Sequence, residues 1–245
     1  MRKRIDLILV EKKIVETRNK AQAMIMAGQI IADGQKVIKS GELHNFDSDI
    51  KIINLSSKWV SRGGQKLSHA IKHFDIKIKD FNCLDIGAST GGFTDVLLNN
   101  EAKKIFAVDV GFNQLHEKIK KNKKVINIEK TNARYLDRNI INEYIDLIVC
   151  DASFISIKKV LKSSLNFLKK NGKVIALIKP QFEANKKEIK KGGVVKDSLV
   201  HQRICNEITS WFENVCYLKV KGIIESPIKG PKGNTEFFIF AKKIK

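Results

Sequence analysis

Four charged residues of the sequence stand where their side chains could move a proton. Asp151 and Lys179 each follow directly after an apolar run. Lys66 lies near the start of a helical pattern, and Glu236 begins a further apolar run. A lone lysine or carboxylate at the end of a strand is most often half of a surface ion pair. Two lysines and two carboxylates that converge on one crevice could instead bind a hydroxyl group and remove its proton. The spacing is compatible with both interpretations.

A glycine-rich segment, DIGASTGGF at residues 85–93, joins an apolar run to a helical pattern. At such a turn an α/β sheet binds nucleotide-like ligands, and an acidic residue that ends the next strand, here Asp109, accepts hydrogen bonds from ribose hydroxyls. Position 89 is Ser where the dinucleotide pattern GxGxxG has Gly. S-adenosylmethionine carries no pyrophosphate and tolerates this looser turn, so the segment favours S-adenosylmethionine as cofactor. The expected cofactor contacts are Asp85, Gly87, Ser89, Thr90, Gly91, Gly92, Phe93, Asp109, Asn132 and Asp151.

Other kinds of site remain compatible with these residues. A dinucleotide is the first alternative for the turn. Residues 87–91, GASTG, also match the GxSxG nucleophile elbow of hydrolases, with Ser89, Asp151 and His201 in the order of a triad. His69 and His73 have the spacing of a metal-binding pair, but no third ligand is evident nearby, so we expect a solvated helix face and no metal site.

Strand-like and helical patterns alternate from residue 81 onward, which predicts a doubly wound, Rossmann-like α/β sheet. The seven expected strands are residues 83–86, 105–110, 125–128, 145–150, 174–178, 215–220 and 236–240. Helices of roughly 10 to 20 residues are expected between most of them, and one helix is expected at residues 197–212. Because the carboxyl ends of neighbouring parallel strands face one crevice, Asp151 and Lys179 should both approach the cofactor.

Residues 1–59 predict a separate small α+β module, and residues 60–245 the larger domain, with a connector at about residues 56–64. Helical patterns begin near Asp6 and after Thr17, the expected N-cap, and the second pattern stops at Gly28. Short strands are expected at residues 30–31, 37–38 and 50–55.

The chain is strongly basic, with 46 Lys and Arg against 26 Asp and Glu in 245 residues and a net charge of +20. This excess favours a polyanionic partner, either nucleic acid or an anionic membrane, although a general bias towards Lys, Ile and Asn accounts for part of it. No apolar run is long enough to span a bilayer, and the four cysteines form no CxxC pair, as expected in a reducing cytoplasm. The expected RNA contacts are Arg4, Lys12, Arg18, Lys20, Arg62, Lys186 and Lys187.

The segments that carry these residues resemble a known family. They are SRGGQKL, LDIGASTGGFTD, VDVGFNQL, TNAR, DASFIS, KPQFE, GGVVKD and SPIKGPKGNTEF. In this order they resemble the hemolysin A (TlyA-type) ribosomal RNA methyltransferases. Residues 4–34 resemble the S4 RNA-binding domain in RIDLILV, TRNKA, IMAGQI and ADG. The four charged residues are similar to the Lys-Asp-Lys-Glu tetrad of 2′-O-methyltransferases related to the heat-shock ribosomal RNA methyltransferase.

The resemblance implies methyl transfer from S-adenosylmethionine to a ribose 2′-hydroxyl, of cytidine, in ribosomal RNA. Lys179 would act as base or alkoxide stabiliser, Asp151 would orient Lys179, and Glu236 would hold Lys66. A free lysine titrates near ~10.4, so a basic Lys179 would need burial beside Lys66. The expected partner is ribosomal RNA in subunits or ribosomes, with no membrane, no metal and a monomeric enzyme. The alternatives are an RNA-binding protein with an inactive methyltransferase fold, and a membrane-active hemolysin.

Overall fold

The computed structural model describes residues 2–26, 28–52 and 58–244. The chain divides into two compact units, Met1–Lys58 and Trp59–Lys245. Residues 53–57 lie outside the described residues; they include the last part of the strand expected at 50–55 and residues 56–57 of the expected connector. The remainder of that connector runs into a helix that begins at Gly63.

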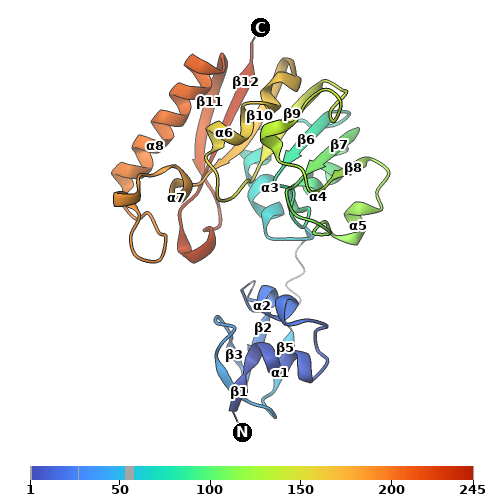
Figure 1. The fold of residues 1–245 in the computed structure, drawn as a ribbon, viewed down its shortest axis with the longest axis vertical. Helices are drawn as coiled ribbons and strands as arrows, with labels where there is room; N and C mark the ends of the chain where they lie inside the picture. Colours follow the sequence, from blue (N-terminus) through green and yellow to red (C-terminus); the bar gives the residue numbers. More distant parts are fainter. Residues whose placement is uncertain (1, 27, 53–57, 245) are drawn as a thin grey trace. The chain divides into compact units, whose positions relative to one another are not determined.

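The N-terminal unit is a small α+β fold, as the sequence predicts (Figure 1). Its helices are α1 (Ile5–Glu11) and α2 (Arg18–Met26), and its strands are β1 (Arg2–Arg4), β2 (Ile30–Ala32), β3 (Gln35–Lys36), β4 (Leu43–Asn45) and β5 (Ile50–Ile52). Strand β1 pairs with β4, and β2 lies between β3 and β5. The backbone N–H of Lys20 donates to the Thr17 hydroxyl at 3.2 Å, as expected of an N-cap.

The expected strand at residues 37–38 is wrong, because β3 ends at Lys36. Two strands have no counterpart in the prediction. Strand β1 consists of three basic residues, and β4 is mostly polar, so neither shows the alternation that marks a half-buried strand. Their pairing with each other, rather than their own pattern, makes them strands.

The larger unit contains the expected seven-stranded, mostly parallel sheet (Figure 1). In chain order its strands are β6 (Asn82–Ile86), β7 (Lys104–Val108), β8 (Val125–Ile128), β9 (Ile145–Cys150), β10 (Leu168–Ile178), β11 (Leu218–Glu225) and β12 (Phe237–Lys243). In space the order is β11-β12-β10-β9-β6-β7-β8, and β12 runs antiparallel to both of its neighbours. The other six strands therefore run in one direction, and their carboxyl ends form one edge of the sheet.

Helices cover both faces of this sheet. In chain order the α-helices are α3 (Gly63–His73), α4 (Gly92–Asn99), α5 (Glu117–Lys120), α6 (Ile157–Leu161), α7 (Pro180–Glu183) and α8 (Ser198–Ser210). Short 3-10 turns lie at Ala133–Tyr135, Ser164–Phe167, Lys186–Glu188 and Pro231–Gly233, and a π-helical turn lies at Trp211–Val215. Most helices between strands are shorter than expected, since α5 has 4 residues and α6 has 5.

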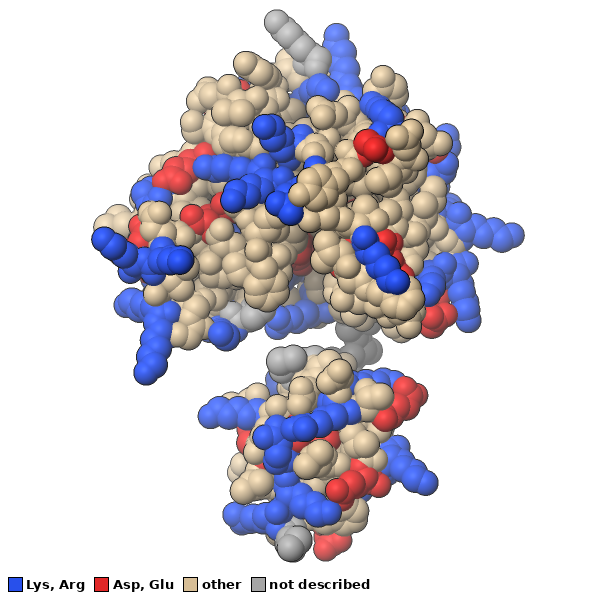
Figure 2. All heavy atoms as spheres, in the orientation of Figure 1, with Lys and Arg blue, Asp and Glu red and all other residues tan. Residues whose placement is uncertain are grey.

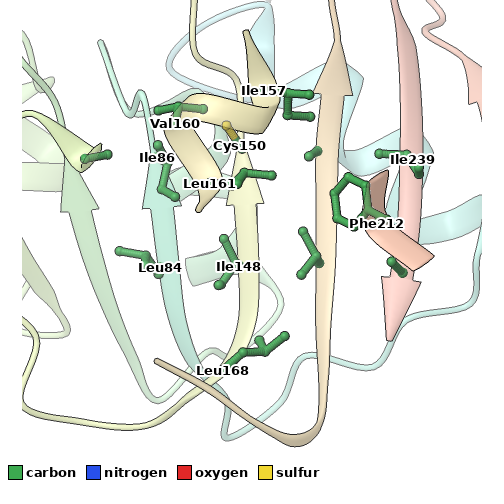
Figure 3. Packing of buried hydrophobic residues seen from close by; sticks show 14 of the residues in the cluster. Leu84, Ile86, Ile148, Cys150, Ile157, Val160, Leu161, Leu168, Phe212 and Ile239 are labelled. Atoms are coloured by element: carbon green, nitrogen blue, oxygen red, sulfur yellow. The ribbon is translucent and has the colours of Figure 1, made fainter. Parts of the chain in front are cut away.

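Alternation along the strands divides the core between the two faces. On β9, Ile148 and Cys150 pack with α6 and α8, whereas Leu147 and Val149 pack with α3 and α4. Figure 3 shows the first of these layers, where Ile148 and Cys150 lie near Leu161. Because both faces of the sheet are buried, both sets of alternating residues are apolar, and the parallel strands appear as continuous apolar runs in the sequence.

The ends of several strands differ from the predicted ones. Strand β7 ends at Val108, and Val110, expected in this strand, is 69% exposed. Strand β11 begins at Leu218 because the chain first makes the π-helical turn after α8. Strand β10 begins at Leu168, earlier than expected, with a shift of its register against β9 before Lys173. Of these differences, only the one at Val110 touches the hollow that the residues after β9 line.

Lysine and arginine side chains spread over the visible face of each unit rather than gathering in a single patch (Figure 2). Several of the expected RNA contacts already bind neighbouring groups of the protein. Lys12 donates to the Ser48 carbonyl at 3.2 Å, and Lys20 pairs with Glu16 at 3.2 Å. Arg62, Lys186 and Lys187 are exposed.

Candidate active site

The structure brings the four charged residues together as two ion pairs. Lys179 Nζ lies 2.6 Å from Asp151 Oδ1, and Lys66 Nζ lies 2.6 Å from Glu236 Oε2. Asp151 and Lys179 directly follow β9 and β10, which are neighbours in the sheet. Ile178 pairs with Phe237, so Lys179 and Glu236 come next to each other just beyond that pair. Lys66 reaches the same place from the first turns of α3.

Both pairs are largely withdrawn from solvent. The side chain of Glu236 is 0% exposed and that of Lys66 6%, while Lys179 is 7% and Asp151 20% exposed. Charges at this depth interact more strongly than surface charges, but each loses its hydration and depends on its partner. Asp151 is the most exposed of the four, so this end of the site faces the solvent.

Lys179 has further acceptors beside Asp151. Its Nζ donates to the Ser153 hydroxyl oxygen at 2.8 Å and, more weakly, to the Asp151 carbonyl at 3.4 Å. These contacts fix the direction of the ammonium group within the site. Ser153 was not among the predicted site residues, although it lies two residues after Asp151 in the same loop.

Glu236 is held on its other oxygen as well. Gln181, two residues after Lys179, donates from Nε2 to Glu236 Oε1 at 3.4 Å. A Cβ atom at Gly230 would lie 2.1 Å from Glu236 Oε1, so the carboxylate occupies the space that a larger residue at position 230 would need. Neither contact has a signature in the sequence.

The glycine-rich turn is tied to the end of the neighbouring strand. Asp109 accepts hydrogen bonds from the backbone N–H of Ser89 at 2.8 Å and of Gly111 at 2.7 Å. Gly87 and Ser89 have positive φ angles of 77° and 47°. At Gly87 a side chain would also meet the backbone of Ala152 at 3.1 Å, so the turn lies directly against the loop that follows β9.

Two hollows adjoin this turn and together form one cleft. The first, of about 280 Å³, is lined by residues 61–63, by the turn, and by Lys66, Asp151 and Lys179. The second, of about 430 Å³, lies on the side of Asp109 and Asn132 and has apolar walls that include Val108 and Ile155. Gly87, Ser89, Asp151 and Ser153 line both hollows. The cleft therefore has one lobe with charged groups and one more apolar lobe.

Most of the expected cofactor contacts line this cleft. Those that do so are Gly87, Ser89, Thr90, Gly92, Phe93, Asp109, Asn132 and Asp151. Phe93 contributes little surface to the cleft, since the residue is 3% exposed and its ring stacks on Phe238 at 6.2 Å between centroids. Asp85 and Gly91 line neither lobe. Gly91 turns the chain into α4 with a φ of 93°, and the Asp85 side chain points away from the cleft, into the protein.

Asp85 is a buried carboxyl group beneath the turn. It is 0% exposed, and one of its oxygens accepts a hydrogen bond from the Thr94 hydroxyl at 2.6 Å. Its other oxygen, Oδ1, is buried and has no hydrogen-bond partner within the described residues. Burial raises the pKa of the Asp85 carboxyl from 3.8 to about 7.

This raised pKa predicts a pH-dependent stability. Between pH ~4 and ~7 the unfolded chain has lost the Asp85 proton while the folded chain keeps it, so the free energy of unfolding falls as pH rises and is constant above ~7. Asp85→Asn, which cannot titrate, should abolish this fall, a difference of about 1 to 3 kcal/mol between pH ~5 and ~8 in urea unfolding. An equal fall in wild type and variant would show that Asp85 is ionised in the folded protein.

The structure contradicts the hydrolase triad. His201 Nε2 lies 3.0 Å from the Val195 carbonyl, and its ring packs against Phe237. It lines a separate hollow between α8 and the strands β11 and β12, whereas Ser89 and Asp151 line the cleft. The order of the three residues in the sequence matched that of a triad. In the fold, however, His201 lies on α8 beside β11 and β12 and does not reach the glycine-rich turn.

An exposed aromatic side chain stands beside the cleft. Phe154 is 90% exposed, has a positive φ of 64°, and lies 5.2 Å from the Phe182 ring. It lines the second lobe, next to Ser153. A bulky residue with this exposure and backbone conformation is uncommon, and strain of this kind gathers at functional sites. The motif DASFIS contained this residue, but only its exposure and backbone angle in the fold distinguish it from a core phenylalanine.

Comparison with known proteins agrees with this site. The family described as FtsJ-like methyltransferase matches residues 59–243, and the S4 domain matches residues 3–42. Hemolysin A of Brachyspira hyodysenteriae is 40% identical over 235 residues, which are 96% of this chain and 97% of that protein. The 16S/23S rRNA (cytidine-2′-O)-methyltransferase TlyA of Mycobacterium tuberculosis is 36% identical over 242 residues, 98% of this chain and 90% of that protein.

A solved structure gives the same result. A Streptococcus thermophilus protein that carries a hemolysin designation superposes with a TM-score of 0.77 at 36% identity, over 99% of this chain and 88% of that chain. These matches confirm the family resemblance and the fold class expected from the motifs. The chain, which also carries an S4 domain, belongs to the FtsJ-like methyltransferases, in the hemolysin A and TlyA group.

Proposed function

We propose that this protein is an S-adenosylmethionine-dependent methyltransferase that modifies the ribose 2′-hydroxyl of a cytidine in ribosomal RNA. The observation that carries the proposal is the pair of withdrawn lysine–carboxylate contacts, Lys179 with Asp151 and Lys66 with Glu236, on one wall of the cleft. The relatives named for this reaction match nearly the whole chain, and the S4 match supports RNA as the partner. We include in the proposal a cytoplasmic monomer that needs no metal ion and acts on ribosomal subunits or ribosomes.

The cleft suits S-adenosylmethionine in its chemistry. The second lobe fits an adenosine. Its apolar walls can pack against the adenine ring, and the Asp109 carboxylate can accept hydrogen bonds from the ribose hydroxyls. Asp151 carries a carboxylate into the other lobe, where it can bind an ammonium group. When bound, the cofactor supplies a methyl group that its sulfonium centre already activates. The protein's own residues must therefore place a hydroxyl oxygen in line with that methyl group and deal with its proton.

Lys179 is the residue that meets the 2′-oxygen in this proposal. The weakest of its contacts is the one with the Asp151 carbonyl at 3.4 Å, and a substrate oxygen can replace it. As a neutral amine Lys179 would take the proton; as the ammonium that pairs with Asp151 it stabilises the negative charge that develops on the oxygen, while Asp151 and Ser153 keep its Nζ in place. Glu236 holds Lys66 beside it. Phe154, exposed at the rim, can stack on the base of the target nucleotide.

The glycine-rich turn gives a test of the cofactor site. Gly87→Ala should weaken the affinity for S-adenosylmethionine about tenfold or more, because the new Cβ is strained at positive φ and pushes on the loop that carries Asp151. Gly34→Ala is the matched control: Gly34 has the same φ of 77° with nothing within 4 Å of its Cβ position. Calorimetric titration with the cofactor should separate the two variants. Equal affinities would place the cofactor elsewhere.

The reaction itself is tested with methyl-labelled S-adenosylmethionine. The protein is incubated with small subunits, large subunits, intact ribosomes and naked ribosomal RNA, and the labelled nucleosides are identified after digestion. We expect label on a ribose 2′-oxygen. Label on a base would contradict the reaction type. Cofactor binding without transfer to any of the four substrates would favour the alternative, an RNA-binding protein with an inactive methyltransferase fold.

The membrane-active alternative has its own check. In the part of the chain that the structure describes, we find no helix with the length and apolar character to cross a bilayer. We expect no release of dye from anionic liposomes at protein concentrations that saturate methyl transfer. Dye release by the Lys179→Met variant as well as by wild type would establish a second activity that does not depend on the cleft.

A further inference from the structure

The N-terminal unit contains a buried carboxylate that binds two arginines. Asp6, in the first turn of α1, is 0% exposed. Arg4 donates to it from two nitrogens, from Nε to Oδ1 and from Nη2 to Oδ2, both at 3.0 Å. Arg18, at the start of α2, donates from Nε to Oδ2 at 3.0 Å, and Gln22 donates to the same oxygen at 2.9 Å. One carboxylate therefore connects β1, α1 and α2.

Both guanidinium groups keep donors on the solvent side. The side chains of Arg4 and Arg18 are 42% and 50% exposed. A guanidinium has five N–H donors, and within the described residues Arg18 uses only its Nε–H on Asp6. Gly41 lies beside Arg4. A Cβ atom at position 41 would come within 3.3 Å of Arg4 Nη1, so glycine at this position leaves room for the Arg4 guanidinium. The unused donors of the two arginines are available to a ligand.

Asp6 does not need both arginines for its own stability in the fold. A bidentate guanidinium such as that of Arg4 already satisfies a buried carboxylate. The second guanidinium brings two like charges to the same oxygen and leaves the cluster with one net positive charge. This arrangement is favourable for an anion that accepts from both groups at once. Planar, forked donors of this kind match a phosphate better than the point charge of a lysine does.

We propose that Asp6 organises Arg4 and Arg18 into a preformed clamp for one phosphate group of the RNA backbone. Asp6 is a positioning residue in this clamp, because it touches the two arginines and not the RNA. The inference rests on the proposed RNA substrate and deepens it, since it assigns a phosphodiester contact to a defined place on the N-terminal unit. The clamp contributes affinity and register rather than sequence readout.

The clamp should persist over the whole physiological pH range. The hydrogen bonds from Arg4 hold the pKa of the Asp6 carboxyl well below its usual range, and Gln22 and Arg18 act in the same direction. Asp6 therefore stays ionised, and its contribution to folding is lost only in strong acid.

A charge-matched pair of variants tests the proposal. Asp6→Asn and Asp49→Asn each remove one negative charge from the N-terminal unit, and Asp49 is an exposed residue that pairs with Lys51. If only net charge mattered, both variants would bind RNA as tightly as wild type or slightly more tightly. The clamp predicts opposite results: Asp49→Asn keeps or gains affinity, whereas Asp6→Asn loses about tenfold.

The measurement is a titration of the full-length protein with purified ribosomal RNA at several salt concentrations. For Asp6→Asn the slope of log K against log salt should fall by about one unit, the amount for one phosphate contact. In methyl transfer, the loss should appear in KM for RNA and not in kcat. Arg18→Lys keeps the positive charge but loses the planar, forked donors of the guanidinium, so its affinity for RNA should fall about 3- to 10-fold. This variant provides the test if Asp6→Asn does not fold.

The outcomes separate this inference from the proposed function. Equal RNA affinity of folded Asp6→Asn and Asp49→Asn, or full affinity of Arg18→Lys, would overturn the clamp while wild type still binds and methylates RNA. A wild-type protein that binds no ribosomal RNA at all would contradict the proposed function itself. Loss of affinity with unchanged salt slope would also contradict the clamp, because no phosphate contact would have been removed.

Discussion

Replacing Lys179 by methionine should lower kcat for methyl transfer by about 10²- to 10⁴-fold, the range expected when a residue that handles the reacting proton is lost. Methionine fills similar space but can neither bind the 2′-oxygen nor accept its proton. Single-turnover transfer from labelled S-adenosylmethionine to the ribosomal substrate measures the effect. Cofactor affinity should change little by comparison, since the turn and the apolar lobe remain.

Lys173→Met is the matched control for this variant. Lys173 lies in the middle of the same strand, β10, five residues before its carboxyl end, and its Nζ is 4.5 Å from the centre of the Phe81 ring. We expect its kcat to stay within about twofold of wild type. If Lys179→Met retained full activity, or if both variants lost it equally, Lys179 would have no part in the chemistry.

Glu236→Gln should lower the free energy of unfolding of the larger unit by about 3 to 5 kcal/mol, in addition to its effect on activity. The substitution leaves the ammonium of Lys66, 6% exposed, without its counter-charge, and an unpaired buried charge is costly. Both tryptophans of the chain, Trp59 and Trp211, belong to this unit, so their fluorescence in urea reports its unfolding directly.

The control for this effect lies one strand away. Glu225 pairs with Lys229 at 2.6 Å, but both side chains are 53% exposed, and Glu225 is opposite Phe237 in the sheet. Glu225→Gln should cost less than about 1 kcal/mol, as for other exposed pairs. The double variant Lys66→Met, Glu236→Gln should recover part of the stability, because it buries no unpaired charge. No recovery would mean that Glu236 stabilises the fold through other contacts.

The sheet and the main charged residues could be predicted because they depend on local patterns. Apolar runs placed β6, β8 and β9 within about a residue of their observed ends, and the rule that parallel strands present their carboxyl ends on one edge brought Asp151 and Lys179 together. The motifs then pointed to Lys66 and Glu236, whose contact crosses from α3 to the start of β12. The roles of all four residues stay predictions until they are measured.

The remaining features depend on tertiary contacts that leave no local trace. The space at Gly230 is defined by a carboxylate six residues further along the chain. Asp85 looked like a ligand of the cofactor, but its side chain faces Thr94 because α4 packs close beneath the turn. Likewise, Arg4 and Arg18 were expected to meet RNA, and nothing in their spacing indicated that both would first bind Asp6.

The place of β12 in the sheet has a consequence for the order of folding. This strand comes last in the sequence, yet it lies between β11 and β10 rather than at an edge. Until it pairs, β10 presents an open edge, and Lys66 has no Glu236 to bind. The strand that closes the sheet is thus also the one that completes the charged site. A folding intermediate that lacks β12 would be both prone to association and inactive, so recovery of methyl transfer during refolding should coincide with closure of the sheet.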